Sequence, residues 1–405
     1  MITGRDIVIL SSIEWHFLWQ GPQEIATRLA RAGNRVLYIE NTGVRTPVLR
    51  DAPRVASRLI SWMSSFTSKG LRTVESDVRV SSPLVLPPLG APWQRKVNRK
   101  VFLPLVVRSA RQFGLKRPVI ISFLPTDTAA DLIAMLRCEE SVVVYYCVAD
   151  FAELSTRPAR MAEAEREVIE VSDVVLSQCD PLAEHCARWT KSVHVVPYGV
   201  NLERFSVNGS ASTLETSARN NGHRHEAPVI GYLGGLHRHV DLDLLVAMAN
   251  ARPDWSWVCV GPDQVGVGKL SALPNIKLVG ELQHHELPEQ IESFDVGIVP
   301  YVRSVYTDTV VPTKINEYLA MGKPVVSTNL PSVCSSYSWD GAVITAEPRL
   351  DSFMRALEHA LALPRDQSTR ARRRDIASLG DWQARLEQIC APIEAAIGSK
   401  SSSRP

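Results

Sequence analysis

The stretch VVPTKINEYLAMGKPVV, from Val310 to Val326, reads as a short helix that leads into an apolar strand. Val311 precedes a proline and is therefore expected to be extended. Pro312 suits the first turn of a helix. Gly322 suits the helix end, and the proline two positions later prevents the helix from continuing.

Two charged residues in this stretch do not fit an ordinary core helix. Lys314 and Glu317 are three positions apart and so share one face of the predicted helix. As a surface ion pair they would contribute only a few tenths of a kcal/mol. The alternative is a ligand site, because free backbone N–H groups at a helix start favour an anion beside Lys314.

Around this stretch, apolar strands alternate with amphipathic helices. Before residue 205 the expected strands are DIVILSS, NRVLYIE, VIISFL, SVVVYY, DVVLSQ and SVHVVPYGV. After residue 228 they are VIGYLGG, SWVCVG, IKLVG, DVGIVPY, KPVVST and AVITA. The pattern predicts an α/β protein with two Rossmann-like, doubly wound parallel-sheet domains. Ligands are expected at the carboxyl ends of the strands, in a cleft that the two domains face.

The domain boundaries follow from shifts in composition. Residues 1–205 are predicted to form an N-terminal domain, and the polar segment 206–228 a linker or loop. Residues 229–365 form the second domain, and 366–398 a C-terminal helical region packing back toward the N-terminal domain. The last residues, 399–405, are predicted to be a disordered tail.

Composition indicates a globular protein of the cytoplasm. The 405 residues are 45% hydrophobic and 22% charged, and no run approaches the ~20 apolar residues of a membrane span. The first residues read as a strand, not a signal peptide. Seven scattered cysteines without a CxxC pair indicate free thiols, not a disulfide framework or a zinc site.

Positive charge is concentrated in residues 45–116, which hold 14 Lys and Arg against three Asp and Glu. Trp and Phe residues are interspersed with these cations. Such a segment suits the interface of an anionic membrane, which would place the protein peripherally at the inner face of the cell membrane. The alternative is an ordinary amphipathic helix packed on the sheet. No nucleic-acid-binding module is recognisable.

Several short motifs are weak when taken alone. Gly234 and Gly235 follow a strand and could admit a phosphate, although a plain turn explains them equally well. Arg238 adds a cation beside them. His237 and His239 lack a third ligand for a metal. GVGKLS lacks the first glycine of a phosphate-binding loop.

Taken in order, however, the motifs resemble a known family. The run from GYLGG through ARPDWSWVCVGP and FDVGIVPY to VVPTKINEYLAMGKPVVST is similar to the donor-binding half of GT-B glycosyltransferases, family 4 type (glycosyl transferases group 1). The N-terminal LWQGPQEIATRLARAGNRVLYIEN resembles the opening of one branch of that family, with Gly21 in place of the usual arginine.

The resemblance implies roles for residues of the second domain. Lys314 matches the lysine that neutralises the donor diphosphate, and Glu317 the glutamate that accepts hydrogen bonds from ribose. The loop Thr309–Thr313 would hold phosphates through its N–H groups, and Thr309 stands where many members carry an acid. The full set of expected donor-binding residues is Gly234, Gly235, Arg238, Thr309, Val310, Pro312, Thr313, Lys314 and Glu317.

The first domain is expected to bind the acceptor. VVVYYCVADF resembles a segment of the same branch, and its Asp150 suits a catalytic base, with a helix cap as the equal alternative. Asp127 is a second candidate that could instead cap the next helix. Glu14, Trp15 and His16 lie on the first strand-to-helix loop, where the acceptor would sit.

The expected function is transfer of a sugar from a nucleotide-sugar donor to a glycan or lipid-linked acceptor in polysaccharide or cell-envelope biosynthesis. The donor would be UDP- or GDP-linked, with no other cofactor and no metal required. A non-catalytic GT-B scaffold protein and a sugar-nucleotide epimerase on the same fold are the alternatives. Turnover with and without acceptor distinguishes them.

Overall fold

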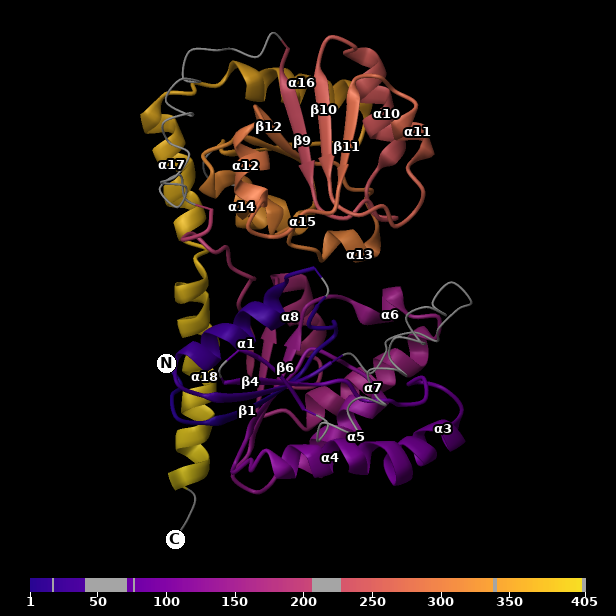
Figure 1. Cartoon of the computed structure of the whole chain (residues 1–405), viewed down its shortest axis with the longest axis vertical. Coiled ribbons are helices and arrows are strands. Elements are labelled where there is room, and N and C mark those ends of the chain that lie inside the picture. Colours follow the sequence, from indigo (N-terminus) through magenta and orange to yellow (C-terminus); the bar gives the residue numbers. More distant parts are fainter. Residues whose placement is uncertain (17, 41–70, 76, 206–226, 338–340, 403–405) are drawn as a thin grey trace. The chain divides into compact units, whose positions relative to one another are not determined.

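A computed structural model describes residues 1–16, 18–40, 71–75, 77–205, 227–337 and 341–402. The chain forms two compact units, each a parallel-rich sheet with helices packed against it (Figure 1). Unit 1 comprises Met1–Val196 with Leu386–Pro405, and unit 2 comprises Pro197–Arg385. The α/β fold class with two doubly wound sheets is therefore confirmed.

Unit 1 is built on an eight-stranded sheet in the order β3-β4-β2-β1-β5-β6-β7-β8. Its strands are β1 (Asp6–Leu10), β2 (Arg35–Ile39), β3 (Arg72–Glu75), β4 (Val78–Ser81), β5 (Val119–Ser122), β6 (Val142–Cys147), β7 (Val174–Ser177) and β8 (Val193–Val195). Its helices are α1 (Gly21–Arg31), α3 (Pro92–Val97), the π-helical segment η2 (Asn98–Phe102), α4 (Leu103–Gln112), α5 (Asp127–Leu136), α6 (Phe151–Leu154), α7 (Pro158–Glu170) and α8 (Asp180–Cys186).

One strand of this sheet departs from the expected parallel arrangement. β3 runs antiparallel to β4 at the edge of the sheet, whereas the other pairs are parallel. An antiparallel strand at the edge of a parallel sheet is common, because an edge strand needs no crossover connection to its neighbour. The interior strands β1, β5, β6 and β7 are wholly buried, which explains their continuous apolar sequences.

Unit 2 is built on a six-stranded parallel sheet in the order β11-β10-β9-β12-β13-β14. Its strands are β9 (Val229–Leu233), β10 (Ser256–Val260), β11 (Ile276–Gly280), β12 (Val296–Val299), β13 (Val325–Thr328) and β14 (Val343–Ala346). Its helices are α10 (Leu242–Ala251), α11 (Gly268–Ser271), α12 (Leu287–Glu292), α13 (Val305–Asp308), α14 (Lys314–Ala320), α15 (Pro331–Ser336), α16 (Leu350–Ala362) and α17 (Gln367–Ser378).

The C-terminal part differs from the predicted boundaries. α17 belongs to unit 2 and packs against α14, so only the chain from Leu386 onward joins unit 1. The last helix, α18 (Trp382–Ser402), continues through residues 399–402, which corrects the prediction of a disordered tail there. Lys400 fixes this end, because its ammonium donates to the Ser141 carbonyl at 2.6 Å and to Asp173 at 2.8 Å, both in unit 1.

Two other predicted segments fall partly outside the described residues. Most of the linker 206–228 and positions 41–70 of the basic stretch are among them. None of the described helices is both long and apolar enough to cross a membrane. All seven cysteines are free thiols; Cys138 and Cys334 are exposed and the other five are buried.

Each sheet has a point where the strand order reverses. In unit 2, β9 lies between β10 and β12, so the chain winds away from β9 in both directions. In unit 1, β1 lies between β2 and β5 in the same way. The carboxyl ends of strands at such reversals are where open α/β sheets bind ligands.

Candidate functional site

The candidate site lies in unit 2, at the carboxyl ends of β9 and β12. β9 leads into Gly234 and Gly235, and β12 leads through Pro300 into Tyr301. α14 packs against β12 and β13 and brings Lys314 to the same place. The Tyr318 hydroxyl of α14 accepts the N–H of Leu233 at 2.7 Å, which fixes the helix to the last residue of β9.

The ammonium group of Lys314 is buried between two tyrosines. Only 9% of the residue is exposed. Its Nζ donates to the hydroxyl of Tyr301 at 2.8 Å and to that of Tyr232 at 3.2 Å. The same nitrogen lies 4.5 Å from the ring centroid of Tyr232 and 4.9 Å from that of Tyr301, within cation–π distance.

Lys314 and Glu317 do not form an ion pair. Within the described part of the chain, the partners of Lys314 are two uncharged hydroxyl groups and none is a carboxylate. A buried ammonium without a counter-ion is costly, since burial removes its hydration and hydroxyl groups replace only part of it. The alternative of a surface salt bridge is therefore wrong, and no carboxylate among the described residues bonds to the Lys314 ammonium.

The two glycines lie directly against this ammonium group. Gly234 has φ +127°, a backbone conformation that side chains disfavour, and a Cβ there would stand 2.9 Å from the Lys314 Nζ. Its N–H is bonded to the carbonyl of Val260. Among the described residues, the N–H of Gly235 has no partner, so one backbone donor remains open beside Lys314.

Glu317 lies on the partly exposed side of α14. Neither a hydrogen bond nor an ion pair to its carboxylate occurs within the described residues, and burial raises its pKa from 4.5 to about 7, with Lys314 opposing the shift. Removal from water disfavours the ionised form, and no bonded donor compensates. Such an acceptor suits a ligand that brings its own hydroxyl donors.

The loop Thr309–Thr313 is partly used by the fold. The N–H groups of Thr309 and Val310 already bond to the carbonyls of the short helix α13, which the sequence did not predict. α14 begins at Lys314, so Pro312 precedes the helix instead of starting it. Within the described residues, the N–H groups of Val311, Thr313 and Lys314 carry no hydrogen bond. The predicted phosphate loop is thereby narrowed to these three donors.

Thr309 stands where many members of the family carry an acid, and it offers no carboxylate to a ligand. The Thr309 hydroxyl donates to the carbonyl of Tyr306 at 2.8 Å. The neighbouring Asp308 carboxylate is paired with Arg303 at 2.7 Å. Arg238 is exposed, and its Nε lies 3.2 Å from the Nε2 of His239.

The sequence prediction missed the groups that hold Lys314. Tyr232 and Tyr301 come from different strand ends, and His237 lies next to Tyr301 with ring centroids 5.6 Å apart. Their contact depends on β9 and β12 being neighbours. Each tyrosine stands near the end of an apolar strand, where aromatic residues are common, so the residue type alone does not indicate a site.

In unit 1, the first predicted acceptor loop lies at the carboxyl end of β1. Trp15 is buried and donates its N–H to the Glu40 carboxylate at 2.9 Å, whereas His16 is exposed. The carbonyls of Glu14 and Trp15 accept from the Gln23 amide at 3.3 and 3.4 Å. Glu40 and Gln23 therefore shape this loop, and neither was singled out from the sequence.

Asp127 and Asp150 follow neighbouring strands, β5 and β6, and both carboxylates have structural partners. Asp150 caps α6, accepting the N–H of Ala152 at 3.0 Å, so the helix-cap alternative holds for it. Asp127 does not cap α5, because Thr126 does so; Asp127 instead accepts the N–H groups of Thr128 and Leu89. Their catalytic role stays a prediction.

A buried network that the sequence did not reveal lies between α7 and α8. Glu165 is 1% exposed and accepts the Tyr145 hydroxyl at 2.6 Å, while its other oxygen lies 3.0 Å from the His185 Nε2. The hydrogen bond to Glu165 raises the pKa of His185 above its ordinary value of 6.5. This network joins both helices to β6.

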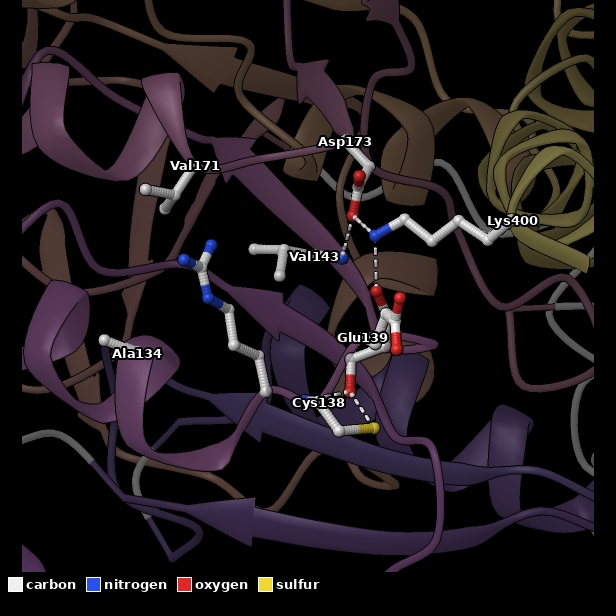
Figure 2. A pocket seen from close by; sticks show the side chains of 9 residues that line it. Ala134, Cys138, Glu139, Val143, Val171, Asp173 and Lys400 are labelled. Atoms are coloured by element: carbon white, nitrogen blue, oxygen red, sulfur yellow. Dashed lines mark hydrogen bonds and ion pairs between the residues drawn. The ribbon is translucent and has the colours of Figure 1, made fainter. Parts of the chain in front are cut away.

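An open cavity of about 390 Å³ lies elsewhere in unit 1, where β6 and β7 begin (Figure 2). Its lining includes Cys138, Asp173 and Lys400, and none of the predicted site residues. No cluster of three or more His, Cys, Asp or Glu side chains that could hold a metal ion occurs among the described residues.

The comparisons with known proteins point to the class of the second unit. Residues 227–362 match the family model described as glycosyl transferases group 1. The match covers most of unit 2 and confirms the resemblance of its motifs to this family.

A curated relative extends the similarity. A Bacillus subtilis (strain 168) protein, TuaH, whose name assigns it to teichuronic acid biosynthesis as a glycosyltransferase, is 33% identical over 237 residues. The match covers 56% of this chain and 58% of that protein. The chain thus spans little more than half the length of this relative.

Solved structures confirm the fold over nearly the whole chain. Sucrose-phosphate synthase of Thermosynechococcus elongatus has a TM-score of 0.69 at 15% identity, covering 98% of this chain and 100% of that one. Anabaena HepE, solved in complex with UDP, has a TM-score of 0.65 at 12% identity, covering 96% and 99%. WaaG, a glycosyltransferase involved in lipopolysaccharide biosynthesis, scores 0.62 at 14%, covering 96% and 98%. The fold is GT-B.

Proposed function

We propose that this chain is a glycosyltransferase that takes its sugar from a nucleoside-diphosphate sugar bound to unit 2. The observation that carries the proposal is the buried ammonium of Lys314, which has two hydroxyl partners and no carboxylate partner among the described residues. A diphosphate supplies the missing negative charge. The open N–H of Gly235 and those of Val311 and Thr313 supply further donors to phosphate oxygens.

Glu317 is proposed to bind the ribose. Ribose offers two neighbouring hydroxyl donors, and the Glu317 carboxylate is an acceptor without a partner in the described part of the chain. Hydroxyl donors stabilise the ionised carboxylate and would return its pKa toward the ordinary range. Lys314 and Glu317 would then hold adjacent parts of one ligand, with UDP and GDP as the first candidates.

The proposed chemistry uses charge stabilisation by unit 2. As the bond between the sugar and the diphosphate breaks, the electron pair goes to the phosphate oxygen, and negative charge grows there. Lys314, held rigidly by Tyr232 and Tyr301, stabilises that charge more than the ground state. Asp150 remains the candidate to orient the acceptor hydroxyl: its Oδ1 caps α6, and the carboxylate has a second oxygen that can accept from a hydroxyl.

The proposed acceptor is a glycan or lipid-linked glycan of the cell envelope. Support comes from the name of the TuaH relative, which assigns it to teichuronic acid biosynthesis. The predicted acceptor residues Glu14, Trp15 and Asp127 follow β1 and β5, the two strands at the reversal in unit 1.

We also propose that α3, η2 and α4 contact an anionic membrane surface. Trp93, Val101 and Leu105 are 60%, 53% and 41% exposed and recur at helical spacing on one side of this continuous helix. Exposed cations accompany them, namely Lys96, Arg99, Lys100 and Arg108. Arg95, in the same basic stretch, instead pairs with Asp131 and Glu167 of unit 1, and the exposed Arg99 also lies 3.7 Å from Asp131. The proposal therefore rests on Lys96, Lys100 and Arg108.

Liposome co-sedimentation tests the membrane proposal. The triple variant Lys96→Ala, Lys100→Ala, Arg108→Ala should lose most binding to phosphatidylglycerol vesicles, because each cation near such a surface contributes about 1 kcal/mol. The double variant Arg188→Ala, Lys191→Ala removes exposed cations elsewhere in unit 1 and should bind as wild type does. Equal binding by the triple variant, or equal binding to neutral vesicles, refutes the proposal.

Turnover tests the proposed function. Purified protein is incubated with a panel of UDP- and GDP-sugars, with and without envelope glycan acceptors, and release of the nucleoside diphosphate is measured. Acceptor-dependent release that is abolished in Lys314→Ala supports the proposal. Nucleotide binding without any release would favour the scaffold alternative, and conversion of the sugar nucleotide without acceptor would favour the epimerase.

A further inference from the structure

The imidazole of His237 lies close enough to Lys314 for the lysine's charge to act on it, and the proposed function assigns it no role. It stands three residues beyond Gly234, in the loop that leads to α10. Its ring packs edge-on against Tyr301, whose hydroxyl accepts from Lys314. The side chain is only partly exposed. A histidine in this place is either a loop anchor or a group that meets the donor.

Backbone geometry fixes which nitrogen of His237 carries the proton. The N–H of His239 donates to the His237 Nδ1 at 3.2 Å. A nitrogen that accepts a hydrogen bond is unprotonated, so the proton of the neutral ring must be on Nε2. Within the described residues no acceptor engages that Nε2–H. The ring is thus oriented by its own loop, with one donor free.

The surroundings of His237 keep the ring uncharged. Burial and the charge of Lys314 lower its pKa from 6.5 to about 4, and His239 and Arg238 act in the same direction. The groups that face it are Lys314 from α14, Tyr301 after β12, and its two loop neighbours, and none of them is acidic. A neutral imidazole donates a hydrogen bond without adding a second buried cation.

We propose that His237 donates its Nε2–H to a non-bridging oxygen of the phosphate that carries the sugar. This inference rests on the proposed function and adds a residue to the same donor site. When the bond from the sugar carbon to the phosphate oxygen breaks, the electron pair stays on that phosphate, and the acceptor oxygen forms the new bond to carbon. The acceptor proton leaves separately, and His237 keeps its own proton throughout.

His237 and Lys314 would bind the same diphosphate in different ways. Lys314 balances the net charge of the diphosphate, while the Nε2–H of His237 binds one oxygen with a defined direction. A hydrogen bond to an oxygen that gains charge strengthens as the reaction proceeds, which favours the transition state over the bound donor. The loop-anchor alternative uses only Nδ1 and predicts no effect on phosphate binding once the fold is intact.

Paired nucleotides separate these two roles. Binding of UDP and UMP, and of GDP and GMP, is measured by isothermal titration for wild type, His237→Ala, His237→Asn and His237→Gln. Gln places an amide donor near the position of Nε2, whereas Asn places its polar group nearer Nδ1 and serves the loop alone. His359→Gln, an exposed histidine on α16 of the same unit, is the matched control.

The expected result is selective for the distal phosphate. His237→Ala and His237→Asn should weaken diphosphate binding about tenfold or more, since a hydrogen bond to a charged group is lost. Monophosphate binding should stay within about twofold, and His237→Gln should recover most of the diphosphate affinity.

Three outcomes overturn the inference alone: unchanged diphosphate binding in His237→Ala, equal losses for mono- and diphosphates, or no recovery in His237→Gln relative to His237→Asn. These three outcomes apply when the wild type binds a nucleoside diphosphate and Lys314→Ala weakens that binding. A wild type that binds no nucleoside diphosphate overturns the proposed function as well, so the two failures are distinguishable.

Discussion

Replacing Glu317 with glutamine should stabilise the ligand-free protein at neutral and alkaline pH. Burial raises the pKa of this carboxyl from 4.5 to about 7, so the folded state disfavours the ionised form. Below pH 4.5 the group is protonated in both the folded and unfolded states and costs nothing. Between pH 4.5 and 7 the unfolded state gives up its proton more readily, so stability falls as pH rises, and above 7 the loss is complete.

The size of this effect follows from the shift. At about 1.4 kcal/mol per pKa unit, the full shift corresponds to about 3 kcal/mol. The Glu317 side chain is partly exposed, and water reduces the difference, so about 1–3 kcal/mol is expected at pH 8. Glu317→Gln removes the titration and should gain that amount at pH 8 but almost nothing at pH 4.5.

Urea denaturation at pH 4.5, 6, 7 and 8 measures the difference. Glu289→Gln, an exposed position on α12 of the same unit, controls for loss of one negative charge. Glu317→Gln should also lose nucleotide affinity, so that stability and binding change in opposite directions, as is common at functional sites. A difference that does not vary with pH, or a variant less stable than wild type at pH 8, refutes the reasoning.

Three further predictions concern residues that stabilise the folds of the two units. Gly234→Ala should destabilise unit 2 by about 1–3 kcal/mol in denaturation experiments, since φ +127° disfavours a side chain and the new Cβ would press on Lys314; an unchanged midpoint contradicts this. Tyr318→Phe should cost about 1–3 kcal/mol, because it leaves the last N–H of β9 without an acceptor; full stability would show that the bond is dispensable. His185→Gln should lower the free energy of unfolding by about 1–2 kcal/mol more at pH 5.5 than at pH 9. The raised pKa of His185 gives stability that is present below pH 6.5 and is lost as pH rises through the folded-state pKa. An equal loss at both pH values would mean that the charge on His185 adds nothing to its bond with Glu165.

The sequence predicted the sheets well because their interior strands are continuous apolar runs. It placed Lys314 and Glu317 on one short helix for the same reason, since the proline, the glycine and the following strand delimit α14. The antiparallel edge strand β3 and the one-turn helix α13 escaped prediction, because neither has a repeating hydrophobic pattern.

The surroundings of Lys314 could not be predicted, because they depend on strand order. Tyr232 and Tyr301 meet only because the chain crosses over to place β12 beside β9. The protonation state of His237 depends on a hydrogen bond from the backbone two residues later, which is a detail of loop geometry. The sequence contains these three residues, but only the fold shows that they share a site.

Calorimetric titration with UDP and GDP tests the central claim most directly. Wild type should bind at least one of them, and Lys314→Ala and Glu317→Ala should each weaken that binding by about ten- to a hundredfold, as expected for losing hydrogen bonds to charged groups. Glu289→Ala should bind as wild type does. Wild type that binds neither nucleotide, or variants at Lys314 and Glu317 that bind as tightly as wild type, would contradict the account.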